Sequence, residues 1–187
     1  VLRGELEALQ DGVRQPTPAS LSSLQAEVST LTKLVDDLHQ LSLSDLGALA
    51  YRKSSVDCVH LLQIAVAAFR ERFRAKGLEI VTHLPPQAPL FGDPDRLNQL
   101  FNNLLENSLR YTDAGGRLEI SAELQPGRLS LCWQDSAPGI SDQQLTRIFE
   151  RFYRAEGSRN RASGGSGLGL AICHNIVEAH DGKIRAE

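Results

Sequence analysis

The sequence predicts an α+β protein in which an N-terminal helical hairpin precedes a sandwich of helices layered on one face of a mixed sheet. Three observations lead to this fold class. An apolar stripe with helical spacing runs through the start of the chain, strand-like and helical patterns alternate irregularly after it, and polar, glycine-containing motifs follow. We expect residues 1–46 to form the hairpin and residues 47–187 to form the layered domain.

Two apolar stripes define the predicted hairpin. The longer stripe has the three- and four-residue spacing of a helical bundle and comprises Leu21, Leu24, Val28, Leu31, Val35 and Leu38. A shorter stripe comprises Leu2, Leu6, Leu9 and Val13, and Pro16 and Pro18 favour a turn between the two. One hairpin cannot bury both stripes, so we expect a homodimeric four-helix bundle. The alternative is that the hairpin packs on the rest of its own chain.

The layered domain is predicted from alternating strand and helix patterns. Strands are expected at Ala48–Lys53, Leu78–Leu84, Arg117–Leu124 and Leu129–Trp133, with a last strand after Asp181-Gly182. Helices are expected at Val56–Arg74, Pro94–Tyr111, Ser141–Phe149 and Gly167–His180, with a mobile loop at Arg154–Ser166. The clearest boundary is at Asp93, which can cap a helix whose first position is Pro94.

The composition excludes several classes of protein. A net charge of only -3 over 187 residues argues against a nucleic-acid partner. No apolar run approaches the roughly 18 residues that span a bilayer, and no signal peptide is visible, so we expect a soluble chain. Cys58, Cys132 and Cys173 lie far apart and form no CxxC pair, which argues against a zinc site.

Asn103 and Asn107 lie four residues apart and therefore on one face of a predicted helix. An amide oxygen suits Mg²⁺ that is shared with phosphate oxygens, because Mg²⁺ keeps its waters and takes few protein ligands. Arg110 is placed to reach a phosphate, and Tyr111 to pack near a sugar. The alternative is a helix with ordinary surface asparagines.

Asp135 ends an apolar strand and can accept a hydrogen bond from the exocyclic amine of adenine. Gly139 then lets the backbone approach the base. The alternative is an ordinary aspartate at a strand-to-turn junction.

A glycine-rich turn at residues 164–167 precedes the last predicted helix. Free N–H groups at such a helix start bind anions, and triphosphate is the expected guest. Of the nearby Arg154, Arg159 and Arg161, one is expected to neutralise phosphate. The alternative is a glycine hinge without a ligand.

Taken in order, residues 102–112 (NNLLENSLRYT), 135–140 (DSAPGI), 148–154 (IFERFYR) and 164–170 (GGSGLGL) resemble the N box, first glycine box, phenylalanine box and second glycine box of sensor histidine kinases. The hairpin resembles that family's dimerisation and histidine-phosphotransfer domain, so the similarity covers essentially the whole chain. Within the family it is greatest to envelope-stress sensor kinases.

The resemblance implies the histidine-kinase/Hsp90-type ATPase fold, with ATP and Mg²⁺ as cofactors. It also implies γ-phosphoryl transfer to a histidine, relay to a response regulator receiver domain, and a cytoplasmic portion of a bacterial inner-membrane protein. Asn107 is the implied Mg²⁺ ligand. The predicted ATP-binding residues are Asn103, Asn107, Arg110, Tyr111, Asp135, Gly139, Ile140, Phe149, Arg154, Gly165, Ser166, Gly167, Leu168, Gly169 and Leu170.

The chain departs from the family pattern in two places. Ala137 replaces the first glycine of the DxGxG motif, which we expect to weaken nucleotide binding. The segment that carries the phosphoacceptor is missing, and no histidine here has its sequence context: His39, His60, His83, His174 and His180. We therefore expect a fragment that binds ATP but cannot phosphorylate itself, and that reaches a membrane only through regions absent from it.

Two other functions remain open. The first is an ATPase of the same fold that drives a conformational change. Such enzymes place a water-activating Glu where this chain has Asn103, and Glu106 lies roughly 100° around the helix from Asn107. A general base must reach its proton donor, so transfer is preferred over hydrolysis. The second is a scaffold that binds no nucleotide.

Overall fold

The computed structural model describes residues 6–7, 9–13, 15–136, 138–154 and 165–187. They form two compact units, Val1–Ala48 and Leu49–Glu187.

The first unit is built on one long helix, α2 (Pro18–Asp45). Thr17 and Ser20 form a capping box at its start, with Pro18 in the first turn, which explains why the helix begins there. This confirms the predicted helix, and residues 15–17 just before it are not helical, as the two prolines predicted. Upstream, residues 6–7 and 9–10 are helical, so the first arm of the hairpin is only partly present among the described residues, and Leu2 lies outside them.

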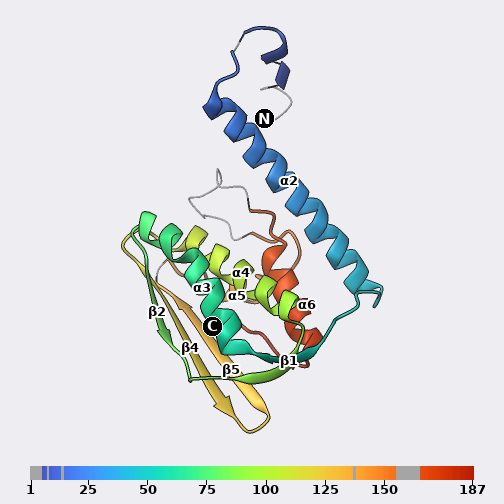
Figure 1. Cartoon of the computed structure of the whole chain (residues 1–187), viewed down its shortest axis with the longest axis vertical. Coiled ribbons are helices and arrows are strands. Elements are labelled where there is room, and N and C mark those ends of the chain that lie inside the picture. Colours follow the sequence, from blue (N-terminus) through green and yellow to red (C-terminus); the bar gives the residue numbers. More distant parts are fainter. Residues whose placement is uncertain (1–5, 8, 14, 137, 155–164) are drawn as a thin grey trace. The chain divides into compact units, whose positions relative to one another are not determined.

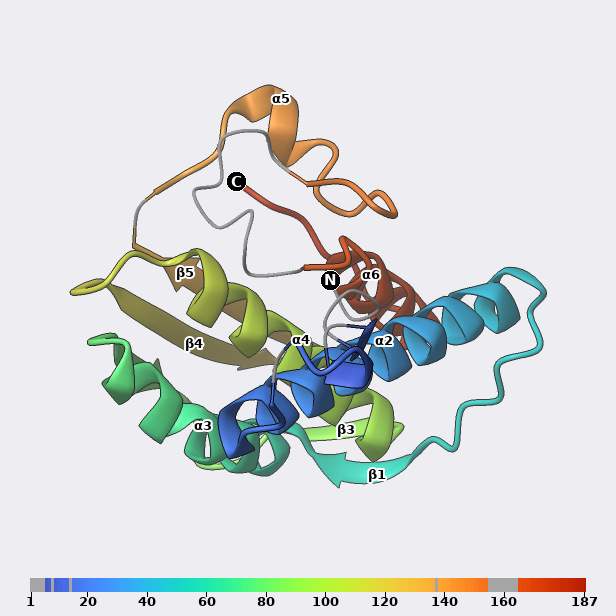
Figure 2. The ribbon, with the colours of Figure 1, turned by 90° about the horizontal axis from the view of Figure 1, so that it is seen from above.

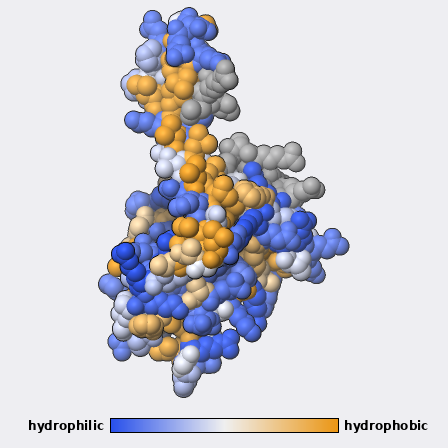
Figure 3. Space-filling model, turned by 90° about the vertical axis from the view of Figure 1, so that its right-hand side faces the viewer, coloured by the Kyte–Doolittle hydropathy of each residue, from blue (hydrophilic) through white to orange (hydrophobic). Residues whose placement is uncertain are grey.

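An apolar band runs along α2 (Figure 3). Five of the six predicted stripe residues are at least half exposed: Leu21, Val28, Leu31, Val35 and Leu38. None of the helices in the described part of the chain combines the length and apolar character needed to cross a bilayer.

The second unit contains a three-stranded sheet in the order β2–β4–β5. Strand β2 (Glu79–His83) runs parallel to β4 (Arg117–Gln125), which pairs antiparallel with β5 (Arg128–Asp135). The helices α3 (Cys58–Ala75), α4 (Pro94–Tyr111) and α6 (Gly169–Ala179) lie side by side over one face of the sheet (Figure 1). The predicted mixed sheet with helices on one face is confirmed.

The core lies between this sheet and the three helices. Its largest members are fully buried and come from every layer: Phe73 of α3, Phe101 and Leu105 of α4, Leu118 and Ile120 of β4, and Ile172 of α6. Leu118 and Ile120 alternate with half-buried Glu119 and Ser121, which is the pattern of a strand with one covered face. Helix α4 thus has the core on one side and is free to present polar residues on another.

Several predicted boundaries are wrong. Residues 48–53 form no strand; instead β1 (Ser54–Asp57) pairs antiparallel with β3 (Pro89–Gly92), a strand that the sequence analysis missed. Helix α3 starts at Cys58 because the Asp57 carboxylate accepts the N–H groups of Val59 and His60.

Three differences follow later in the chain. Helix α5 (Asp142–Leu145) is shorter than predicted, and α6 starts two residues later, after Gly167 and Leu168. Residues 183–187 form no strand. Figure 2 shows α5 on the opposite side of α4 and α6 from the β1–β3 ladder.

Candidate nucleotide site

Helix α4, which carries the asparagine pair, is fixed at both ends. At its start, the Asp93 carboxylate accepts the N–H groups of Asp95 and Arg96 at 3.0 and 3.1 Å. Burial alone would raise the pKa of Asp93, but hydrogen bonds from backbone N–H groups lower it overall, so the cap carries its charge. At its end, the Lys76 ammonium donates to the carbonyls of Leu109 and Thr112 at 2.6 and 2.7 Å.

The asparagine face of α4 meets the start of α6. The Asn103 side-chain amide donates to the carbonyl of Gly169 at 3.5 Å. A Cβ on Gly169 would lie 3.9 Å from the Asn103 amide carbon, which is ordinary contact. Asn107 is half-buried one turn along the same face. The first and last of the predicted motifs are therefore neighbours.

Gly165 lies against the end of α4. A Cβ at this position would overlap the Arg110 guanidinium and would lie 3.6 Å from the Tyr111 hydroxyl. A larger residue at position 165 must therefore displace Arg110. This close approach gives the glycine a physical reason and places two predicted phosphate-binding segments together.

Gly167 joins the phenylalanine segment to the glycine segment. Its φ of +70° favours glycine, and a Cβ would lie only 2.8 Å from the backbone carbonyl carbon of Phe152. The Phe152 N–H donates to the Gly167 carbonyl at 2.9 Å, and Phe152 itself has a positive φ of 61°. Phe149 packs on His174 of α6, with ring centroids 5.9 Å apart.

The N-cap residue of α6 provides no side-chain hydrogen bond to the first N–H groups of the helix. Leu168 precedes the helix, is buried and supplies no side-chain cap, whereas the Ser166 hydroxyl accepts the Leu168 N–H at 3.2 Å. The first N–H groups of a helix have no partner within it. Those of Gly169 and Leu170 are therefore suited to bind an anion.

Asp135 ends β5 beside α4. The Thr112 hydroxyl donates to its carboxylate at 3.5 Å, the limit of a hydrogen bond, and the Ser108 hydroxyl lies one turn earlier on the same face of α4. The residue as a whole is exposed, yet the protein crowds its carboxyl group on one side, and this burial raises its pKa despite the two hydroxyls.

The structure gives fewer contacts for three other predicted ATP-binding residues: Gly139, Ile140 and Arg154. Gly139 and Ile140 are exposed, and in the part of the chain that the structure describes, nothing beyond its chain neighbours lies within 4 Å of a Cβ built on Gly139. Crowding by these residues does not require glycine there. Arg154 is exposed. Ala137, Arg159 and Arg161 lie outside the described residues.

Sequence reasoning missed Ser108, Thr112 and Trp133. The indole N–H of Trp133 donates to the buried Ser108 hydroxyl at 3.0 Å. A signal for the two hydroxyls existed, because they are four residues apart on a helix facing the strand that Asp135 ends.

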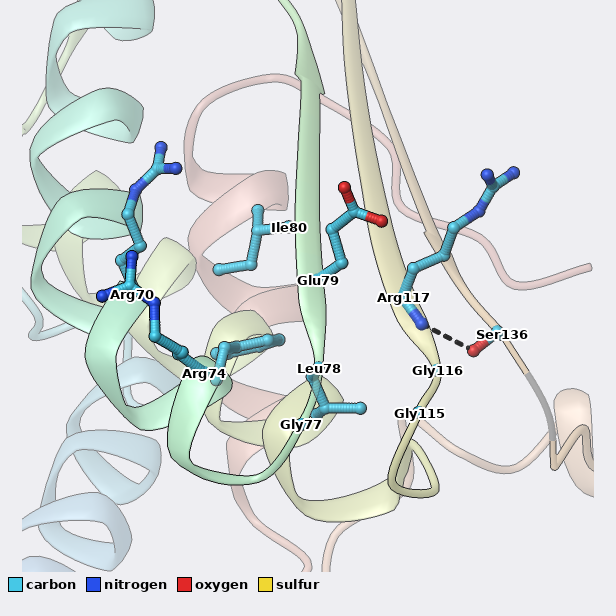
Figure 4. A pocket seen from close by; sticks show the side chains of 11 residues that line it. Arg70, Arg74, Gly77, Leu78, Glu79, Ile80, Gly115, Gly116, Arg117 and Ser136 are labelled. Carbon is cyan, nitrogen blue, oxygen red and sulfur yellow. Dashed lines mark hydrogen bonds between the residues drawn. The ribbon is translucent and has the colours of Figure 1, made fainter.

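A hollow of about 690 Å³ opens elsewhere, between α3 and the starts of β2 and β4 (Figure 4). Its arginines lie on different elements, because Arg70 belongs to α3 and Arg117 to the start of β4, with β2 between them in Figure 4. It adjoins the predicted site only through Ser136, which follows Asp135, and none of the predicted nucleotide residues lines it.

Residues 92–187 match the model of the histidine kinase-, DNA gyrase B- and HSP90-like ATPases. The chain belongs to this ATPase family. The predicted α+β fold of the histidine-kinase/Hsp90-type ATPases is thereby confirmed, with its hairpin only partly present among the described residues.

The relatives of this family member are sensor histidine kinases. The signal transduction histidine-protein kinase BaeS of Escherichia coli is 68% identical over 186 residues, which cover 100% of this chain and 40% of BaeS. The predicted similarity to BaeS-type envelope-stress kinases is confirmed. The chain spans well under two thirds of that relative's length.

Solved structures of histidine kinases have a similar fold. The histidine kinase AdeS of Acinetobacter baumannii superposes with a TM-score of 0.84 at 30% identity, over 100% of this chain and 86% of that one. The histidine kinase ThkA, solved in complex with the response regulator protein TrrA, superposes with a TM-score of 0.76 at 19% identity, over 100% of this chain and 52% of that one. The second similarity shows the fold alone.

Proposed function

We propose that this chain is part of a two-component sensor histidine kinase that binds Mg²⁺-ATP and transfers the γ-phosphoryl group to a histidine on a dimerisation helix. One observation carries the proposal: three motifs far apart in the sequence meet around α4. Asn103 donates to the Gly169 carbonyl, Arg110 lies against Gly165, and Thr112 donates to Asp135.

The residues present suit this cofactor. The half-buried Asn107 amide offers an uncharged oxygen, as Mg²⁺ shared with phosphates prefers. The glycine segment before α6 offers backbone N–H groups to phosphate, and Arg110 beside it offers a positive charge. Asp135 offers an acceptor to the amine of adenine.

Each group has a role in positioning. Bound ATP supplies the γ-phosphoryl group. Asp135 selects and orients the base, Asn107 holds the metal, and Arg110 with the α6 start neutralises and aligns the phosphates. Phe149 and Phe152, anchored on α6 and Gly167, fix one end of the segment that leads to the glycine motif.

The contact between Asn103 and Gly169 favours phosphoryl transfer over hydrolysis of ATP. Related ATPases resemble one another in placing a water-activating Glu at this position. Here the side chain is an amide that donates to the Gly169 carbonyl, so it supplies no base to activate water.

The remaining assignments extend the same proposal. Residues 1–46 belong to the dimerisation and phosphotransfer domain, and residues 47–187 form the catalytic ATP-binding domain. The exposed stripe of α2 supports a homodimer, because five apolar side chains on one helix face need a partner. The partner in relay is a response regulator receiver domain, and the chain is the cytoplasmic portion of an inner-membrane protein.

Calorimetric titration of the chain with a non-hydrolysable ATP analogue tests the proposal, with and without Mg²⁺. We expect binding that Mg²⁺ strengthens, that Asp135→Asn weakens strongly, and that becomes independent of Mg²⁺ in Asn107→Ala. A folded chain that binds no analogue would instead be a scaffold, and binding unchanged in both variants would place the nucleotide elsewhere.

A further inference from the structure

The site contains a buried hydroxyl to which the family motifs assign no role. Ser108 is 1% exposed and lies in the last turn of α4, and serine is a mediocre helix former. An unpaired buried hydroxyl is costly, so this side chain must be satisfied by partners. Its partners define what it does.

The first partner is Trp133 on β5. The indole N–H can only donate, and it donates to the Ser108 oxygen at 3.0 Å. A serine hydroxyl has one proton of its own. With the oxygen occupied by the indole N–H, that proton is directed to an acceptor.

The acceptor within reach is the Asp135 carboxylate, because Thr112, one turn further along α4, donates to it. The Ser108 hydroxyl also lowers the pKa of Asp135 against the effect of burial. Trp133 and Asp135 are two residues apart and therefore on one face of β5, while Ser108 and Thr112 are one turn apart on α4. Two hydroxyls of the helix thus face an indole and a carboxylate of the strand. The sequence of donors runs from Trp133 through Ser108 to Asp135.

We propose that Ser108, oriented by Trp133, is a positioning residue for base recognition: its hydroxyl donates to the Asp135 carboxylate and keeps it an acceptor for the amino group of adenine. This inference rests on the proposed function. An ionised carboxylate only accepts hydrogen bonds, whereas a protonated one also donates. The hydroxyl therefore favours adenine, whose N6 donates, over hypoxanthine, whose O6 accepts.

Burial raises the pKa of Asp135, and the hydrogen bond from Ser108 opposes that effect. Without the hydroxyl, the carboxyl group is more easily protonated and its orientation depends on the 3.5 Å contact from Thr112. Both changes reduce discrimination between the two bases.

The test measures base preference rather than affinity alone. Mg²⁺-ADP and Mg²⁺-IDP are titrated by calorimetry into the whole chain, Ser108→Ala and Trp133→Phe. In Ser108→Ala we expect ADP affinity to fall about tenfold, the scale of one hydrogen bond, while IDP affinity changes little. Trp133→Phe should lower the ratio of ADP affinity to IDP affinity less than Ser108→Ala does. In that variant the Ser108 hydroxyl is still present, but the indole N–H that orients it is gone.

Additivity tests the order of the contacts. Because Trp133 acts through Ser108, the double variant should have the base preference of Ser108→Ala alone. Ser130→Ala is the matched control: this residue lies on β5 but five positions from Asp135, on the other face of the sheet, and its preference should equal that of the wild type.

The outcomes separate the two proposals. No ADP binding by the folded wild-type chain overturns the proposed function, and this inference with it. Wild-type binding with an ADP preference that Ser108→Ala leaves unchanged overturns only the role of Ser108. Equal loss of ADP and IDP affinity also overturns it, because a merely structural role would affect both. If Ser108→Ala does not fold, the unchanged preference of Trp133→Phe is the contradicting result.

Discussion

At the scale of single residues, Asp135 combines a functional requirement with a structural cost. Burial raises the pKa of its carboxyl group more than its hydroxyl partners lower it. A group with a raised pKa in the folded state binds its proton more tightly there than in the unfolded chain. Its contribution to stability therefore falls as the pH rises from its unfolded pKa to its folded pKa.

The direction of this pKa shift predicts that replacing Asp135 has opposite effects on nucleotide affinity and on stability. At neutral pH, Asp135→Asn should unfold at the same or a slightly higher temperature than the wild type, while its affinity for an ATP analogue falls sharply. In the wild type, affinity for the ATP analogue should weaken as the pH falls through the raised pKa of Asp135. A protonated carboxyl group also donates a hydrogen bond and therefore matches the adenine amine less well. Thermal melts and titrations over a pH series measure both effects; a variant that loses stability at neutral pH contradicts the prediction.

Gly165 gives a second prediction at this scale. Alanine there must push aside the Arg110 guanidinium, which is the far end of a flexible side chain. We expect Gly165→Ala to keep its thermal stability and to lose roughly fivefold to tenfold in affinity for the ATP analogue, the scale of one displaced charged contact. Arg110→Met supplies the control, since adding Gly165→Ala to it should cost little more affinity. Full additivity of the two changes would disprove the coupling.

At the scale of elements, helix α4 shows what is predictable from sequence. Its range was predicted from Asp93 and Pro94, because capping is a local interaction between near neighbours. Strands β1 and β3 were missed or displaced, because each has four residues and their pairing is non-local. The role of Ser108 was missed for the same reason, since it depends on how α4 packs against β5. The motifs that contain Gly165 and Gly167 could be recognised from the sequence. The contacts of these glycines with Arg110 and Phe152 are long-range and could be found only in the structure.

The end of α4 supports a prediction about stability. The Lys76 ammonium donates to the carbonyls of Leu109, Arg110 and Thr112, at the negative end of the helix dipole. Replacing it by methionine keeps the apolar stem and removes these bonds. Lys76→Met should lower the free energy of unfolding by about 1–2 kcal/mol, measured by urea denaturation. Lys53→Met is the control, because its 3.5 Å contact to the exposed Asp181 is worth little.

At the scale of the whole molecule, the two units make separate contributions. The second unit has its own core and brings the three motifs together, so nucleotide binding should not depend on association. The first unit presents an exposed apolar stripe on α2, which is costly in water unless a second copy covers it. Dimerisation and nucleotide binding are therefore expected to be separable by mutation.

Leu31 tests this separation, because it lies in the middle of the stripe and is 51% exposed. Leu31→Glu places a charge in the seam of the proposed four-helix bundle but disturbs no core of the single chain. We expect light scattering to show a dimer for the wild type and a monomer for the variant, with unchanged affinity for the ATP analogue. Ala26→Glu, five positions away and on the far side of the helix from the seam, should remain dimeric. Dimers in both variants would mean that the stripe is not the interface, and a wild-type monomer at high concentration would mean that α2 alone does not supply one.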